Sequence, residues 1–70
     1  MIIFNKAIVR FFSMVDNCNK SSGLFEVEVV YKYGKNLLKT FKDVENSEIY
    51  EVQEKLDYIS SLISFRKEGI

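Results

Sequence analysis

Apolar and charged residues alternate through the middle of the chain. From Phe25 to Tyr33 the apolar positions are separated by single charged ones, and only Val30 interrupts the alternation. A period of two residues is typical of a strand with one buried face. The pattern therefore predicts a strand over residues 24–33, around which the rest of the chain is organised.

The stretch that follows indicates a hairpin. Residues 33–36 include Gly34, and glycine accepts the positive φ angles that tight turns require. With an odd number of loop residues, Tyr31 faces Leu37, so apolar residues pair across the two strands. We expect the return strand at residues 37–42.

Residues 7–15 fit two interpretations. As a strand, they are rich in β-branched and aromatic residues. As a helix, they place Lys6, Arg10 and Ser13 on one polar face. The strand is favoured, because a β-rich run followed by a polar loop, here residues 16–23, and a second strand is the usual form of a hairpin.

The C-terminal third of the chain has a helical period. Its apolar residues recur at steps of three and four: Ile49, Val52, Leu56, Ile59 and Ile63. Such a stripe predicts an amphipathic helix over residues 47–67. Arg66 and Lys67 in its last turn suit the negative end of the helix dipole.

These elements define an α+β fold class. Its architecture is a three-stranded antiparallel β-meander with one C-terminal helix packed on one face, in the order β-β-β-α. If residues 7–15 are helical, the order becomes α-β-β-α. A chain of 70 residues has room for a single small domain.

The composition argues against an enzyme. The chain has no His and one Cys, Cys18, so it lacks the commonest general base and the usual zinc ligands. The three glycines are far apart, which excludes a glycine-rich phosphate loop. We expect no catalytic residues, no cofactor and no metal.

Charge is distributed unevenly although the net charge is zero. Residues 1–42 carry seven Lys or Arg against three Asp or Glu, whereas residues 43–57 carry six acids against Lys55 alone. The chain therefore has a basic part and an acidic part.

The acidic helix with an apolar flank predicts a protein-binding surface. Its candidate residues are Tyr58, Leu62, Phe65, Glu51, Glu54 and Asp57. An apolar centre with a charged rim is common at such surfaces. We expect a non-enzymatic protein-interaction domain, a small regulator or inhibitor that binds a larger protein. Surplus apolar surface also predicts a homo-oligomer, in the simplest case a homodimer.

An alternative is a small nucleic-acid-binding domain that uses a basic β-ribbon. Its candidate residues are Tyr31, Lys32, Tyr33, Lys35, Lys39 and Lys42. Lysines could contact phosphates and tyrosines could stack on bases. The absence of an overall basic excess makes this the second choice.

The cellular setting follows from the same composition. A single Cys and no secretory start indicate a cytoplasmic protein. The first 15 residues are too short and too charged to span a membrane. Abundant Lys, Asn, Ile, Phe, Tyr and Glu suit an AT-rich coding sequence of phage or bacterial type.

Overall fold

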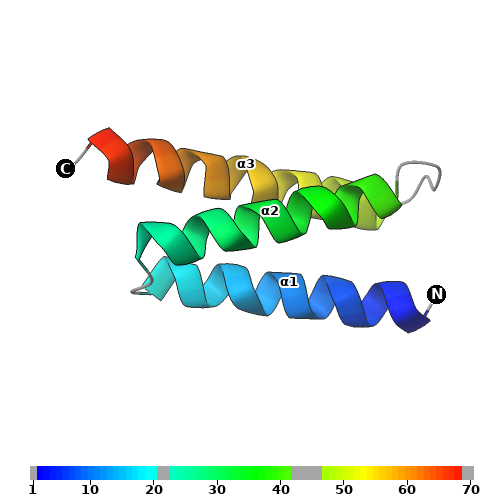
Figure 1. Ribbon diagram of the computed structural model, residues 1–70. Coiled ribbons are helices and arrows are strands. Elements are labelled where there is room, and N and C mark those ends of the chain that lie inside the picture. Colours follow the sequence, from blue (N-terminus) through cyan, green and yellow to red (C-terminus); the bar gives the residue numbers. More distant parts are fainter. Residues whose placement is uncertain (1, 21–22, 42–46, 69–70) are drawn as a thin grey trace.

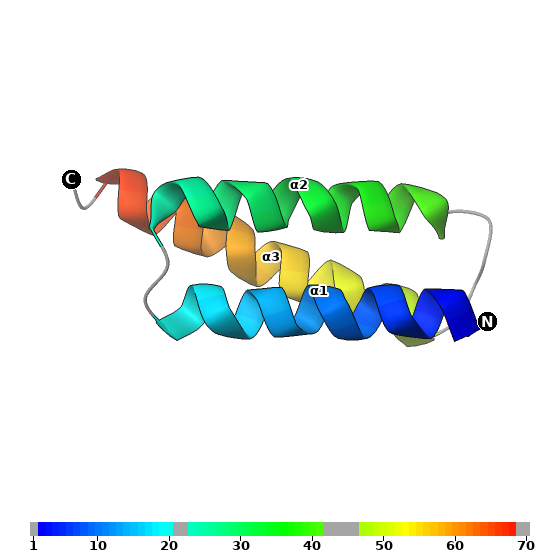
Figure 2. The ribbon, with the colours of Figure 1, turned by 60° about the horizontal axis from the view of Figure 1, so that its bottom comes forward.

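The computed structural model describes residues 2–20, 23–41 and 47–68 and shows an antiparallel bundle of three helices. These helices are α1 (Ile2–Lys20), α2 (Leu24–Thr40) and α3 (Ser47–Glu68). Consecutive helices run in opposite directions (Figures 1 and 2). The bundle is elongated, with extents of 40 × 17 × 16 Å.

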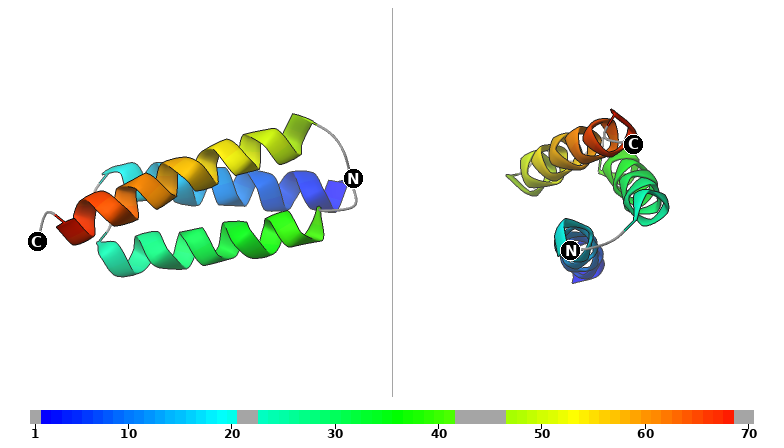
Figure 3. Two further views of the ribbon diagram at one scale, coloured as in Figure 1. Left: turned by 90° about the horizontal axis from the view of Figure 1, so that it is seen from above. Right: turned by 90° about the vertical axis from the view of Figure 1, so that its left-hand side faces the viewer.

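Helix α2 is the central element of the bundle. It lies between α1 and α3 in Figure 1 and packs against both of them. The end-on view in Figure 3 shows the same arrangement, and α1 and α3 contact one another less than either contacts α2. The side between α1 and α3 is therefore the most open side of the bundle.

The core is built from apolar side chains at helical spacing in all three helices. The buried residues are Ile8, Phe11, Val15, Cys18, Val27, Val30, Leu37, Phe41, Val52, Leu56 and Ile59. Within the described residues, no polar or charged side chain is buried. Burial of apolar surface is thus the main force that holds the helices together.

Gly34 allows the three helices to approach closely. It is buried in the middle of α2. A Cβ atom at this position would lie 2.5 Å from Cε1 of Phe11 in α1 and 2.7 Å from Cδ2 of Leu56 in α3. Carbon atoms in van der Waals contact are about 3.5–4.0 Å apart, so only glycine fits here without displacing a neighbour.

The start of α2 explains one charged residue of the predicted strand. The backbone N–H of Gly23, at the N-cap, donates a 2.8 Å hydrogen bond to Oε1 of Glu26. A carboxylate in the first turn also faces the positive end of the helix dipole. Glu26 therefore stabilises a helix N-terminus, although its alternation with apolar residues had indicated a strand.

The predicted strands over residues 24–33 and 37–42 are wrong, because the described part of this region is helical. The turn expected at Gly34 lies inside α2. In so apolar a segment a helical period fits as well as alternation does: Val27, Val30, Gly34 and Leu37 are buried. Residues that alternation had placed in the core, Phe25 and Val29, are 77% and 45% exposed.

The predicted strand over residues 7–15 is also wrong, and so is the first part of the predicted loop, residues 16–20, whereas residues 21–22 lie outside the described residues. Helix α1 continues to Lys20, and Cys18 is part of the core. The alternative order α-β-β-α was right about the first segment and wrong about the ribbon. The α+β class is thus replaced by an all-helical bundle, with no strand among the described residues.

The predicted C-terminal helix is present as α3. Val52, Leu56 and Ile59 of the predicted stripe are buried. Ile49 and Ile63 are partly buried and pack against the same core. The helix therefore presents its predicted face, although to two other helices instead of a sheet.

We predict that Gly34→Ala destabilises the protein by up to about 2 kcal/mol. Alanine gains about 1 kcal/mol over glycine in a helix interior. Overpacking a full core, however, costs about 1–3 kcal/mol. The rings and methyls that the new methyl group would meet cannot move into solvent, since Phe11 is 0% and Leu56 3% exposed. Chemical denaturation measures the change.

Asn36→Ala is the control for this substitution. Asn36 is exposed on the same helix, so alanine should act through helix propensity alone and stabilise by a few tenths of a kcal/mol. Stabilisation by Gly34→Ala equal to or greater than that of the control would contradict the close approach at Gly34.

Candidate functional site

Two grooves follow α3, and different residues of the helix line each of them. Gln53, Leu56, Asp57 and Ser60 line the groove shared with α2. Glu54, Lys55 and Tyr58 line the groove shared with α1. We call these the α2/α3 groove and the α1/α3 groove.

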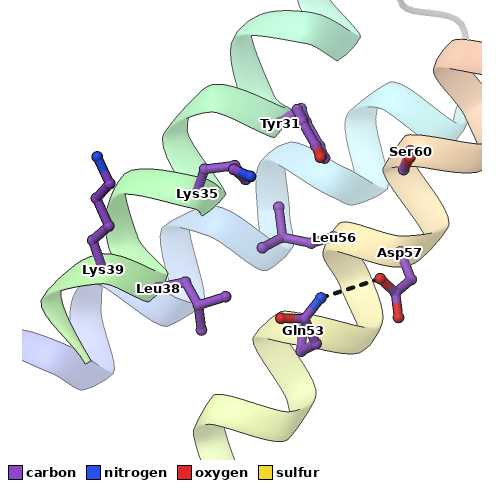
Figure 4. A pocket seen from close by; sticks show the side chains of 8 residues that line it. All are labelled: Tyr31, Lys35, Leu38, Lys39, Gln53, Leu56, Asp57 and Ser60. Carbon is purple, nitrogen blue, oxygen red and sulfur yellow. Dashed lines mark hydrogen bonds between the residues drawn. The ribbon is translucent and has the colours of Figure 1, made fainter. Parts of the chain in front are cut away.

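The α2/α3 groove has a volume of about 360 Å³. Its α2 side consists of Tyr31, Lys35, Leu38 and Lys39. Figure 4 shows Leu38 and the buried Leu56 between the polar residues of the two helices. Lys35 Nζ lies 5.7 Å from the centre of the Tyr31 ring, a distance suited to a cation–π contact.

Opposite charges lie on the two sides of this groove. Lys35 belongs to α2 and Asp57 to α3, and both are exposed. Asp57 Oδ1 accepts a 3.1 Å hydrogen bond from Nε2 of Gln53, one turn earlier in α3 (Figure 4). That bond restricts the Asp57 carboxylate at the rim, where it can meet a cation from outside.

The α1/α3 groove has a volume of about 430 Å³. From α1 it is lined by Val15, Asp16 and Asn19. The Tyr58 hydroxyl donates a hydrogen bond to the side-chain oxygen of Asn19, which joins the two helices across the groove. Val15 is buried, so the groove has an apolar floor beneath polar sides.

The charge of this groove is mainly negative. Asp16 and Glu54 contribute carboxylates from different helices. The cation at the groove, Lys55, has its Nζ 5.6 Å from the centre of the Phe12 ring. With two carboxylates against one ammonium, the side chains that line the groove have a net negative charge.

Polar contacts fix the C-terminal end of α3 on both neighbours. Arg66 donates a 3.1 Å hydrogen bond from a guanidinium nitrogen to the carbonyl oxygen of Cys18 in α1. Lys67 Nζ lies 3.3 Å from Oε2 of Glu28 in α2. Near its C-terminus α3 is therefore bound to α1 and to α2, the helices that form the opposite walls of the two grooves.

The six protein-interface candidates do not form one surface. Tyr58 and Glu54 line the α1/α3 groove, and Asp57 lines the α2/α3 groove. Leu62 is partly buried and packs on the core. Phe65 is 72% exposed, whereas Tyr58 is 38% exposed. Glu51 is exposed one turn before Glu54.

The nucleic-acid candidates also do not all lie on one surface. Tyr31, Lys35 and Lys39 come together in the α2/α3 groove. Lys32 is exposed, and its spacing of three and seven residues from these lysines places it on the same side of α2.

The remaining two nucleic-acid candidates are Tyr33 and Lys42. Tyr33 is directed toward α1, where its ring stacks on Phe11 with centroids 6.3 Å apart. Lys42 lies outside the described residues. The Lys/Tyr β-ribbon is therefore wrong as a structure, and a stripe of lysines on α2 replaces it.

Asp16 and Asn19 were not predicted as site residues, because the sequence pattern placed them in a loop. Their spacing from Phe12, four and seven residues, is helical, and this signal could have identified them. Lys55 was predicted only as a neighbour of the acids, because its contact with Phe12 joins residues far apart in the chain.

Neither a metal site nor a membrane-spanning helix is found among the described residues. No three His, Cys, Asp or Glu side chains there are grouped so that they could hold a metal ion. None of the helices there combines the length and apolar character needed to cross a bilayer. No protein-family model, curated protein or solved structure matches the chain.

We predict that Tyr58→Phe destabilises the protein by about 0.5–1 kcal/mol, because it removes the hydrogen bond to Asn19 across the α1/α3 groove. Thermal or chemical unfolding measures the change. A double-mutant cycle with Asn19→Ala should show coupling of similar size.

Tyr50→Phe is the matched control. Tyr50 is 75% exposed on α3, so loss of its hydroxyl should change stability by less than about 0.5 kcal/mol. Equal effects of the two Tyr→Phe substitutions, together with zero coupling to Asn19, would show that the bond does not link the helices.

Proposed function

We propose that the protein is a non-enzymatic interaction protein of phage or bacterial type, a cytoplasmic regulator or inhibitor that binds a larger protein. In this proposal a basic segment of the partner lies in the α1/α3 groove. The observation that carries the proposal is the convergence of Asp16 and Glu54, from two helices, on an open groove of about 430 Å³.

The dimensions and polarity of the groove support a peptide segment as its ligand. The buried Val15 provides an apolar floor for the aliphatic part of a Lys or Arg side chain. Asp16 and Glu54 are available at the sides for its charged end. Glu51, one turn before Glu54, extends the negative surface along α3.

The rigidity of the groove supports the same proposal. Its two walls are joined by the Tyr58–Asn19 hydrogen bond and by the Lys55–Phe12 contact. A preformed groove loses little conformational freedom when a partner binds, which favours affinity. Acidic groups at its edges accelerate association with a basic partner and select against acidic ones.

Site-specific photocrosslinking tests this function. A photoreactive phenylalanine analogue replaces Glu51, beside the groove, or Asn36, which is exposed on α2, a helix that contributes no residue to this groove. In cells that produce the protein, position 51 should give an adduct with one larger protein and position 36 should not. Glu54→Lys should abolish the adduct because it reverses a groove charge.

Glu68→Lys is the charge-matched control, since Glu68 is exposed on α3 and does not line the groove. It should leave the adduct unchanged. An adduct that survives Glu54→Lys, or that is lost equally with Glu68→Lys, would contradict a role for the groove.

The same protein also allows a test of nucleic-acid binding. Lys32, Lys35 and Lys39 lie along one side of α2, but Glu28 and Asp57 lie close to them. We therefore expect no electrophoretic shift with mixed DNA and RNA at low salt. A shift that Lys35→Glu and Lys39→Glu abolish would replace the proposed function, because phosphate contacts depend on such lysines.

A further inference from the structure

The face formed by α2 and α3 carries a positive and a negative rim. Lys35 and Lys39 line the α2/α3 groove from one helix, and Asp57 lines it from the other. In Figure 4, Lys35 extends over the groove while Lys39 extends away from it. Lys35 and Asp57, both described and both exposed, form no ion pair with one another. Each can therefore meet an opposite charge from another molecule.

Such a face is complementary to itself under one symmetry operation. Helices α2 and α3 are antiparallel neighbours (Figures 1 and 2). A two-fold axis parallel to the helices, between two stacked copies, places α2 of each copy antiparallel on α3 of the other. Positive rims then face negative rims twice. A two-fold axis perpendicular to the helices would place α2 on α2 and oppose lysines with lysines.

The positions of Lys35 and Asp57 along the length of the bundle fit the two-fold axis that runs parallel to the helices. Rotation about an axis parallel to the helices keeps every residue at its own level along the bundle. Lys35 and Asp57 line the same groove and so lie at similar levels. Lys35 of one copy consequently meets the partner's Asp57, and the symmetric contact repeats the pair.

The size of the face is adequate for a dimer. The molecule measures 40 Å by 17 Å along its two longest extents, which gives roughly 700 Å² in projection, and a specific interface needs about 1,000 Å² in total, or about 500 Å² on each partner. Half-buried Tyr31 and Leu38 supply apolar area between the charged rims.

We propose that a second copy of this chain packs on the α2/α3 face as a two-fold symmetric dimer, in which α2 of each copy lies antiparallel to α3 of the other. Ion pairs between Lys35 and the partner's Asp57 determine this arrangement. The α1/α3 groove is lined by other residues of α3. The dimer can therefore be tested separately from the proposed function.

Charge reversal tests the dimer by sedimentation equilibrium at low salt. The wild-type protein should dimerise at micromolar to high-micromolar concentration. Lys35→Glu and Asp57→Lys should each weaken the dimer at least about tenfold, because each variant opposes like charges at both contacts. Circular dichroism should show that both variants remain helical.

Mixing the two variants gives the decisive result. A heterodimer of Lys35→Glu with Asp57→Lys has two contacts. One joins the two introduced charges and the other joins the retained Lys35 and Asp57, so both contacts pair opposite charges and the mixture should dimerise although each variant alone does so weakly. The double variant in one chain should recover in the same way, because both of its contacts pair opposite charges. It should dimerise within about threefold of the wild-type affinity.

Asp16→Lys is the matched control. Asp16 lies in the α1/α3 groove, and its reversal changes net charge as much as Asp57→Lys does. It should leave the dimer unchanged. A monomeric wild-type protein at high-micromolar concentration, equal weakening by Asp16→Lys, or failure of the double variant to recover dimerisation would each overturn the proposal.

Discussion

The close approach at Gly34 is the constraint on which the rest of the bundle depends. Because residue 34 has no side chain, Phe11 from α1 and Leu56 from α3 both reach the backbone of α2. The Phe11 ring also stacks on Tyr33 and contacts Phe12 at a centroid distance of 5.8 Å. One small residue thus brings three helices and an aromatic cluster together.

This contact also sets the directions of the polar residues of α3. With Leu56 directed into the core, successive side chains turn by about 100° along the helix. Asp57 consequently lies on the side of α2, whereas Glu54 and Tyr58 lie further around the helix and line the groove shared with α1. The acidic block of the sequence is therefore divided between two grooves, and each groove combines acids with residues of a different helix.

Sequence reasoning could identify α3 because its apolar residues follow one helical stripe and its outer positions are polar. It failed for α2, where Phe25 and Val29 are apolar yet exposed and make alternation look regular. Gly34 was interpreted as a turn residue, since a sequence does not show that glycine is needed for close packing. The pairing of Asn19 with Tyr58 depends on tertiary structure and could not be read locally.

The most direct test of this account is a nuclear Overhauser spectrum of the isotopically labelled protein. We expect cross-peaks from the α-protons of Gly34 to both the Phe11 ring and a Leu56 δ-methyl group, since a Cβ atom at residue 34 would overlap both side chains. Absence of both cross-peaks, together with cross-strand α-proton contacts between residues 24–33 and 37–42, would show that α2 is a hairpin and would contradict the bundle.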